Sequence, residues 1–168
     1  ISDHMQDSTN ETLSQLPIRL LTATYEDSSK AKALLLAINA IEEEGKAGGL
    51  RDRQLALMYD IAVVMDADNV TVPGFLSEVN RAYCTGVWSM QAHRTGKNLN
   101  TDIALLDGVS EEINNGFFRS GHNALGLSAG LAGSGMAFHY FWYYNAVQEL
   151  ETAGEDKELE LALLECGI

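Results

Sequence analysis

Cysteines, basic residues and long apolar runs are all scarce in this sequence of 168 residues. Its two cysteines, Cys84 and Cys166, have neither disulfide nor metal-ligand spacing, so we expect reduced, buried thiols. The four histidines are scattered, which argues against a zinc site. No apolar run approaches the ~20 residues of a membrane-spanning helix, so no transmembrane segment is expected in this chain.

Positive charge is also in short supply, with 11 Lys and Arg against 24 Asp and Glu and a net charge of −13. Nonspecific DNA or RNA binding needs a basic surface, so we expect no nucleic-acid partner. A nucleotide ligand stays compatible with this charge, because a metal ion and one or two lysines neutralise a diphosphate locally. The pattern Gly-x-Ser-x-Gly occurs at residues 126–130, but no strand-like β-branched stretch precedes it, so we do not expect a nucleophile elbow, and no P-loop is present. The length and the 46% hydrophobic content indicate one domain over residues 1–168.

An apolar run at 61–65 followed by Asp66 and Asp68 is the most informative stretch. Such an unbroken run indicates a strand buried on both faces of a parallel sheet, and ligands collect at the carboxyl ends of such strands. Alternation along the chain puts both carboxylates on one side, where a hard divalent cation that bridges phosphates suits them. The alternative is an Asp-rich turn after a core strand, with Asn69 helping the chain to turn.

Helical and extended patterns alternate along the rest of the chain. Ser28 or Ser29 is available as the N-cap of a helix from Lys30 to about Glu44, and residues 87–91 predict a strand. A long helix is expected over 101–119, with five apolar residues facing inward: Ile103, Leu106, Val109, Ile113 and Phe117. The alternation of strands and helices predicts an α/β fold with a mostly parallel sheet.

Two single residues are candidates for ligand contacts. Lys30 lies where a helix begins, and helix N-termini attract anions, so a lysine there adds a formal positive charge to an anion site. The alternative is a solvated helix lysine. Asp3 lies at the expected tip of a strand and has the chemistry to accept a hydrogen bond from a base N–H, although it also suits a turn.

Two later segments complete the candidate site. Glu155 and Asp156 open the last helix and form a second carboxylate pair in addition to Asp66 and Asp68. One of the two pairs is able to hold a metal while the other removes a proton. Capping and the helix dipole explain Glu155 and Asp156 without catalysis. Residues 133–138 place glycine-exposed backbone beside an apolar surface, a mixture that binds sugars; a tightly packed turn is the alternative.

Five short motifs, in this order and at this spacing, resemble the family 2 glycosyltransferases. They are residues 2–4 (SDH), 30–34 (KAKAL), 64–69 (VMDADN), 133–138 (GSGMAF) and 154–159 (GEDKEL). Residues 91–95 and 97–101 also resemble a bacterial branch of that family. The resemblance implies a GT-A fold, Rossmann-like, with a mostly parallel sheet flanked by helices. It also implies a UDP-sugar donor and a divalent metal, Mg or Mn.

The resemblance further assigns roles to the nucleotide-binding residues of this chain. Asp3 would contact the uracil of a UDP-sugar, and Lys30 would lie near the base or the diphosphate. Asp66 would meet the ribose or base side. Asp68 would ligate the metal that bridges the phosphates.

The same resemblance implies the transfer chemistry. Gly135 and Met136 would line the sugar or acceptor region. Asp156 would be the base that deprotonates an acceptor hydroxyl, with Glu155 supporting it, and attack opposite the departing nucleotide would invert the anomeric centre. The acceptor would be a carbohydrate or a lipid-linked molecule in polysaccharide or cell-envelope glycan synthesis. We expect a cytoplasmic location, at the inner face of the membrane in the full-length protein.

The chain departs from the family pattern at three places. The motif of the fold's first strand does not occur in this sequence, Leu35 replaces a customary asparagine, and no Gln-x-x-Arg-Trp element follows Asp156. Two other functions remain open on the residues. Asp66 to Val70 fits a haloacid-dehalogenase-like phosphohydrolase, with Asp66 as nucleophile and Asp68 as acid/base. A noncatalytic binding fragment is the third reading.

Overall fold

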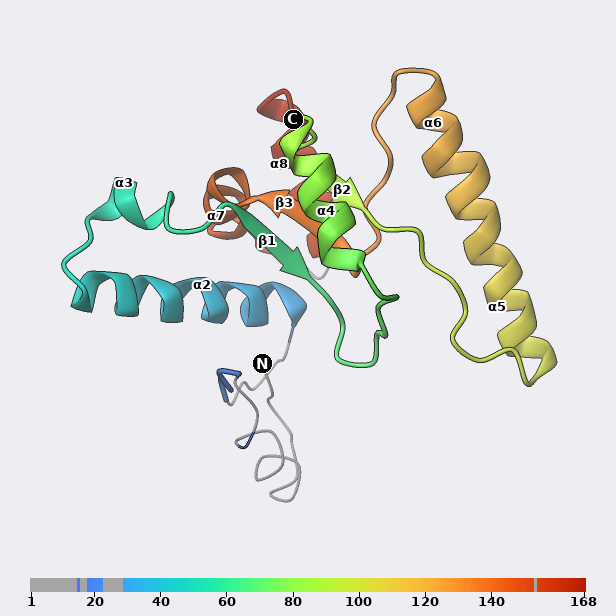
Figure 1. Ribbon diagram of the computed structural model, residues 1–168, viewed down its shortest axis with the longest axis horizontal. Helices are drawn as coiled ribbons and strands as arrows, with labels where there is room; N and C mark the ends of the chain where they lie inside the picture. The colour runs from blue at the N-terminus through green and yellow to red at the C-terminus, as the bar shows by residue number, and fades with distance from the viewer. Residues whose placement is uncertain (1–14, 16–17, 23–28, 153) are drawn as a thin grey trace.

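The computed structural model describes residues 15, 18–22, 29–152 and 154–168. Asp3 lies outside these residues. The elements follow in the order α2 (Lys30–Ala47), α3 (Asp52–Leu55), β1 (Ile61–Val64), α4 (Phe75–Cys84), β2 (Ser89–Gln91), α5 (Asp102–Ile113), the π-helix η1 (Asn114–Ser120), α6 (Gly121–Ala124), β3 (Met136–His139), α7 (Tyr140–Val147) and α8 (Glu155–Glu165) (Figure 1).

The sheet of the described chain has three strands in the order β1-β3-β2, and β3 pairs antiparallel with both neighbours. In the register, Val64 and Gln91 both lie opposite Met136, on its two sides. The expected mostly parallel, Rossmann-like GT-A sheet is therefore wrong. The apolar run indicated a strand correctly, but a run of apolar residues does not encode the direction of the strand beside it.

The position of β1 also differs from the prediction. We expected it to be buried on both faces, yet it is an outer strand of the described sheet, and of its four residues only Val64 is buried. The central place belongs to β3, in which Met136, Ala137 and Phe138 are all buried. Unbroken burial follows because β3 is paired on both edges and covered by helices (Figure 1).

Helix α2 begins as the sequence predicts. The Ser29 hydroxyl accepts a hydrogen bond from Lys32 N at 3.2 Å, which satisfies one free amide of the first turn. Ile38 lies on the buried side of the helix, and Gly45, in the last turn, allows the close approach of Leu55 from α3.

One hydrophobic core joins the helices to the sheet. Phe138 of β3 stacks on Tyr143 of α7, with ring centroids 5.3 Å apart. The largest fully buried side chains come from five different elements: Ile38, Leu55, Met136, Phe138, Val147 and Leu159. Burial of such side chains stabilises the fold by about 1.5–3 kcal/mol each before the entropy of ordering them is subtracted.

Helices α5, η1 and α6 run end to end as an arm beside the sheet (Figure 1). The five apolar residues that we expected to face inward are exposed, with Ile103 at 73% and Phe117 at 74% of full exposure. That prediction is wrong because periodicity identifies an apolar face but not the element that covers it. Asn115, by contrast, is buried and ties η1 to the strand side by donating to the carbonyl oxygen of Arg94 at 2.5 Å.

Both cysteines are free, as expected, but the expectation that they are buried is wrong. Cys84 lies at the end of α4 and Cys166 just after α8, and both are exposed. In the described part of the chain, no helix has the length and apolar character that crossing a membrane requires.

Candidate functional site

Lys30, the first residue of α2, joins three segments that are distant in sequence. Its Nζ lies 2.5 Å from Oδ1 of Asp66 at the end of β1, and it also donates to the carbonyl oxygen of Gly133. Oε1 of Glu155, at the start of α8, is 3.9 Å from the same Nζ. The start of α2, the end of β1 and the start of α8 therefore meet at Gly133.

The backbone of Gly133 is the point around which these charges gather. Its φ is +67°, in the left-handed region that favours glycine. A Cβ placed there would lie 3.7 Å from Lys30 Nζ, 3.7 Å from Glu155 Oε1 and 3.9 Å from Asp156 Oδ2. The other carboxylate oxygen of Asp156, Oδ1, accepts a hydrogen bond from Lys157 N at 2.9 Å, which fixes the side chain. The first two residues of α8 thus both lie at Gly133, and Glu155 is the one that faces the Lys30 ammonium group.

Burial makes the lysine necessary for this arrangement. The Glu155 residue is only 7% exposed, and a carboxylate removed from water needs a counter-charge or hydrogen-bond donors. Lys30 supplies the positive charge. Three carboxylates and one ammonium group lie close together, so the cluster as a whole keeps excess negative charge.

A buried serine holds the glycine loop against β1. Ser134 Oγ accepts a hydrogen bond from Asp66 N at 2.8 Å and donates to Asn69 Oδ1. The Gln91 amide fixes the other side of the loop, because its Nε2 donates to Ser134 O and its Oε1 accepts from Ala132 N, both at 2.9 Å. Reasoning from the sequence did not assign a role to Ser134 or Gln91. The available signal was the Gly-Ser-Gly pattern at 133–135, and in the structure both of its glycines have positive φ.

Gly135, the residue after Ser134, helps to line a cavity of about 410 Å³. Asp68, Arg94 and Lys97 also line it. Lys97 Nζ donates to the backbone oxygen of Asp68 at 2.8 Å, and Arg94 Nη1 donates to the backbone oxygen of Ala132 at 2.8 Å. Within the described chain neither cation forms an ion pair with a carboxylate, and two basic residues and one acidic residue line the cavity.

The predicted site residues divide between these two places. Lys30, Asp66, Glu155 and Asp156 gather around Gly133, whereas Asp68 and Gly135 line the cavity. The Asp68 carboxylate is exposed and accepts a hydrogen bond from Asn69 Nδ2 at 3.2 Å. Asp156 does not line the cavity.

Met136, predicted to line a sugar or acceptor region, is a core residue of β3. Its side chain is fully buried. It belongs to the same hydrophobic cluster as Phe138 and Leu159, so any contact between residue 136 and a ligand in this conformation is limited to its backbone.

The side chains that could act as metal ligands show whether the site suits the predicted divalent metal. Among residues 29–152 and 154–168, no group of three His, Cys, Asp or Glu side chains is placed to hold a metal ion. Mg²⁺, however, usually keeps several waters and takes one or two carboxylates together with substrate phosphates. The exposed carboxylate of Asp68 fits that second arrangement, in which the ion is shared with a bound diphosphate.

Comparisons with protein families, with curated proteins and with solved structures find no match to this chain. The likeness to family 2 glycosyltransferases therefore stays a resemblance of motifs.

Proposed function

We propose that this chain binds a nucleotide-diphosphate sugar, with UDP as the nucleotide, and transfers the sugar to a hydroxyl acceptor with the help of a divalent metal. The observation that carries the proposal is the charge arrangement along residues 133–135. Two basic residues and Asp68 line one cavity with Gly135, and an ammonium group and three carboxylates gather at Gly133.

The cavity has the charges that a metal-bound diphosphate requires. Arg94 and Lys97 are free to pair with phosphate oxygens, because their present partners in the described chain are backbone carbonyls. Asp68 would hold the metal, which supplies stabilisation of the leaving diphosphate when it is bound. In a chain with a net charge of −13, such local positive charge is what makes a dianionic ligand acceptable.

The cluster at Gly133 has the parts of a proton-transfer site. Asp156 is half-buried, and its Oδ2 lies 3.9 Å from the position of a Cβ on Gly133, where the glycine has no side chain. Asp156 would accept the proton of an acceptor hydroxyl, and Glu155, close to Lys30 on the buried side, would hold the start of α8 in place. Lys30 keeps the carboxylates together, because without it three like charges would repel one another.

The test of nucleotide binding is the thermal shift caused by UDP with Mn²⁺, compared between Asp68→Ala and Asp60→Ala. Asp60 precedes the same strand at its opposite end and is exposed, so it serves as the matched control. We expect the shift in the wild type and the control and its loss in Asp68→Ala. An equal shift in all three proteins would remove Asp68 from the metal site.

The proton-transfer role is tested separately with Asp156→Asn. The metal-dependent release of UDP from a UDP-sugar should fall by about 10²-fold or more, while UDP binding stays unchanged. Because Asn keeps the size of the side chain, unchanged turnover would show that Asp156 is not the base. Loss of binding would show a structural role instead.

A further inference from the structure

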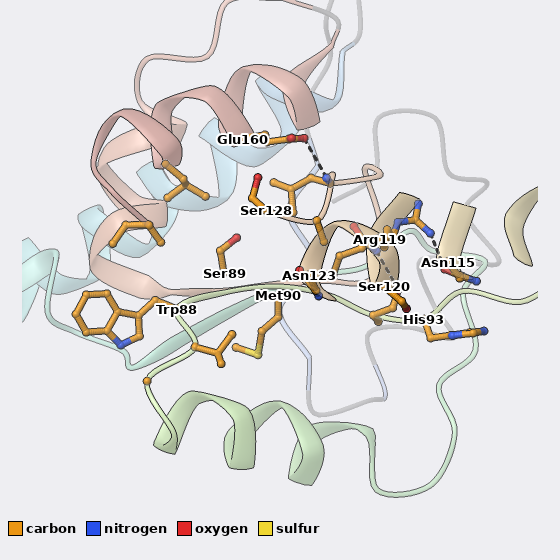
Figure 2. A pocket seen from close by; sticks show the side chains of 18 of the residues that line it. Trp88, Ser89, Met90, His93, Asn115, Arg119, Ser120, Asn123, Ser128 and Glu160 are labelled. Atoms are coloured by element: carbon orange, nitrogen blue, oxygen red, sulfur yellow. Dashed lines mark hydrogen bonds between the residues drawn. The ribbon is translucent and has the colours of Figure 1, made fainter. Parts of the chain in front are cut away.

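A cavity of about 750 Å³, lined by none of the residues of the charged cluster, lies between the outer edge of β2, the π-helix η1 and helix α8. Figure 2 shows Trp88 at one end of it and His93 at the other, with Glu160 above the strand. Its volume is within the range of ligand sites, about 300–1,000 Å³. We propose that this cleft binds a neutral, polyhydroxylated chain, a short oligosaccharide, at a site that does not depend on the proposed nucleotide site.

The edge of β2 brings unpaired backbone groups to the cleft. Ala92 N donates to Gly135 O at 2.7 Å and His139 N donates to Trp88 O at 2.8 Å, which sets the pattern of the antiparallel ladder. Because inward and outward groups alternate along such a ladder, Ser89 and Gln91 direct their N–H and C=O groups to the outer edge. In the described sheet no strand pairs with that edge, so donors and acceptors alternate along the cleft.

The charged side chains of the cleft are already compensated. Arg119 Nη1 donates to Glu111 Oε1 at 2.7 Å and to Asn115 Oδ1 at 2.6 Å. Glu160 Oε2 accepts from Lys157 Nζ at 2.9 Å and from Leu131 N at 3.0 Å. A charged ligand would therefore find no unpaired partner of opposite charge here, and binding it would require breaking these pairs.

The other charged pair at the cleft leads to the same conclusion. His93 Nε2 lies 3.0 Å from Glu112 Oε1, so this carboxylate of α5 is also engaged by a neighbour. The cleft thus differs from the cavity at Asp68, where Arg94 and Lys97 have only backbone partners in the described chain. The two sites select ligands of different charge.

Hydroxyl and amide groups remain available to a ligand. Ser120 and Asn123 on the helical arm and Ser89 and Ser128 on the facing side line the cleft, and their side chains make no hydrogen bond to another described residue. Trp88 is held edge-on by His139, with ring centroids 5.6 Å apart, and stays 42% exposed. Sugars suit this mixture, because their hydroxyls donate and accept while their C–H faces pack on an indole.

A peptide is the main competing ligand, since the free edge of β2 is able to pair with an extended strand. Two observations favour the sugar. β2 has only three residues, so an added strand would find a short ladder. The lining also combines hydroxyl and amide side chains without a described partner with apolar ones such as Val87 and Leu163, a mixture that suits the two faces of a sugar. An apolar ligand is disfavoured because it would leave the hydroxyl and amide groups without water or a partner.

The experiment is a calorimetric titration of the protein, without nucleotide or metal, with four probes: cellotetraose, tetra-N-acetylchitotetraose, tetragalacturonate and an uncharged threonine-rich peptide. We expect saturable binding of a neutral tetrasaccharide in the millimolar range or tighter, about −4 kcal/mol or better. Ser128→Trp, at an exposed loop position, should fill the cleft and weaken that binding by about tenfold or more.

Two further variants make the result specific. Ser120→Ala, inside the cleft, should weaken binding measurably, whereas Ser110→Ala, exposed on α5 outside the cleft, should not. The proposal is overturned if neither neutral sugar binds, if tetragalacturonate or the peptide is the preferred ligand, or if Ser128→Trp binds like the wild type. Since nucleotide binding is measured with UDP and Mn²⁺ alone, failure of one proposal leaves the other intact.

Discussion

Replacing Lys30 with methionine tests the charge cluster most severely. Methionine keeps much of the apolar stem, but it removes the ammonium group from Asp66, Gly133 O and Glu155. Asp66 is 44% exposed and regains water at little cost, whereas the Glu155 side chain is only 10% exposed and would keep a poorly hydrated negative charge. The lost hydrogen bond to the carbonyl oxygen costs about 1 kcal/mol, and the poorly hydrated carboxylate adds a partial desolvation penalty. We therefore expect the free energy of unfolding to fall by about 2 kcal/mol.

For a chain of this size, that loss corresponds to a fall in Tm of about 4–8 °C. Urea unfolding followed by circular dichroism gives the free energy directly. The matched control is Arg81→Met, which breaks an ion pair to Glu78 between two largely exposed side chains and should leave the unfolding free energy nearly unchanged.

A double variant separates charge from packing. Glu155→Gln added to Lys30→Met should recover part of the loss, because a neutral amide leaves no unpaired buried charge. If Lys30→Met is as stable as Arg81→Met, or if the two changes add without recovery, the reasoning about the cluster is refuted.

Three further predictions concern the scaffold. The pKa of Glu42 is lowered by the hydrogen bond that it accepts from Lys46 and then by the one from Tyr144. The carboxylate therefore stabilises the fold above the ordinary pKa of 4.5, and this stabilisation is lost as the pH falls through the lowered pKa. The unfolding free energy of the wild type should decline more steeply below pH 4.5 than that of Glu42→Gln, and parallel acid titrations of the two proteins would contradict this. Gly45→Ala should destabilise the protein, because the new Cβ would lie 2.2 Å from Leu55 Cδ2. Overpacking of this kind costs about 1–3 kcal/mol, whereas alanine gains only about 1 kcal/mol in helix propensity. A raised Tm would show that Leu55 moves aside freely. Gly135→Ala should cost about 1–3 kcal/mol in urea unfolding, since φ is +70° and the Cβ would lie 3.3 Å from the nearest methyl carbon; no measurable loss would mean that the loop relaxes.

Local signals in the sequence predicted several elements well. Ser29 caps α2 as expected, and the apolar run at 61–65 does form a strand. These features depend on residues within one or two turns of each other, so the sequence carries them directly.

Long-range arrangement was predicted poorly. The place of β1 at the edge of the described sheet, and its antiparallel pairing with β3, depend on where the chain returns after the helical arm. The exposed face of Ile103 and Phe117 shows the same limit, since helical periodicity is local whereas burial needs a neighbour.

The site lies between these extremes. Lys30, Asp66, Glu155 and Asp156 were selected from three motifs that lie far apart in the sequence, and they gather around Gly133. The role of each in a reaction stays a prediction. Ser134, which ties the glycine loop to β1, was not predicted because its two partners, Asp66 N and Asn69 Oδ1, are brought to it only by the folded turn.

The most direct test of the central claim is a calorimetric titration of the wild-type protein with UDP, with and without Mn²⁺. Two uncompensated cations and one exposed carboxylate in one cavity predict saturable binding that requires the metal. No heat of binding under either condition, together with Mg²⁺-dependent hydrolysis of a phosphomonoester that Asp66→Asn abolishes, would contradict the nucleotide-sugar site and assign these carboxylates to a phosphohydrolase.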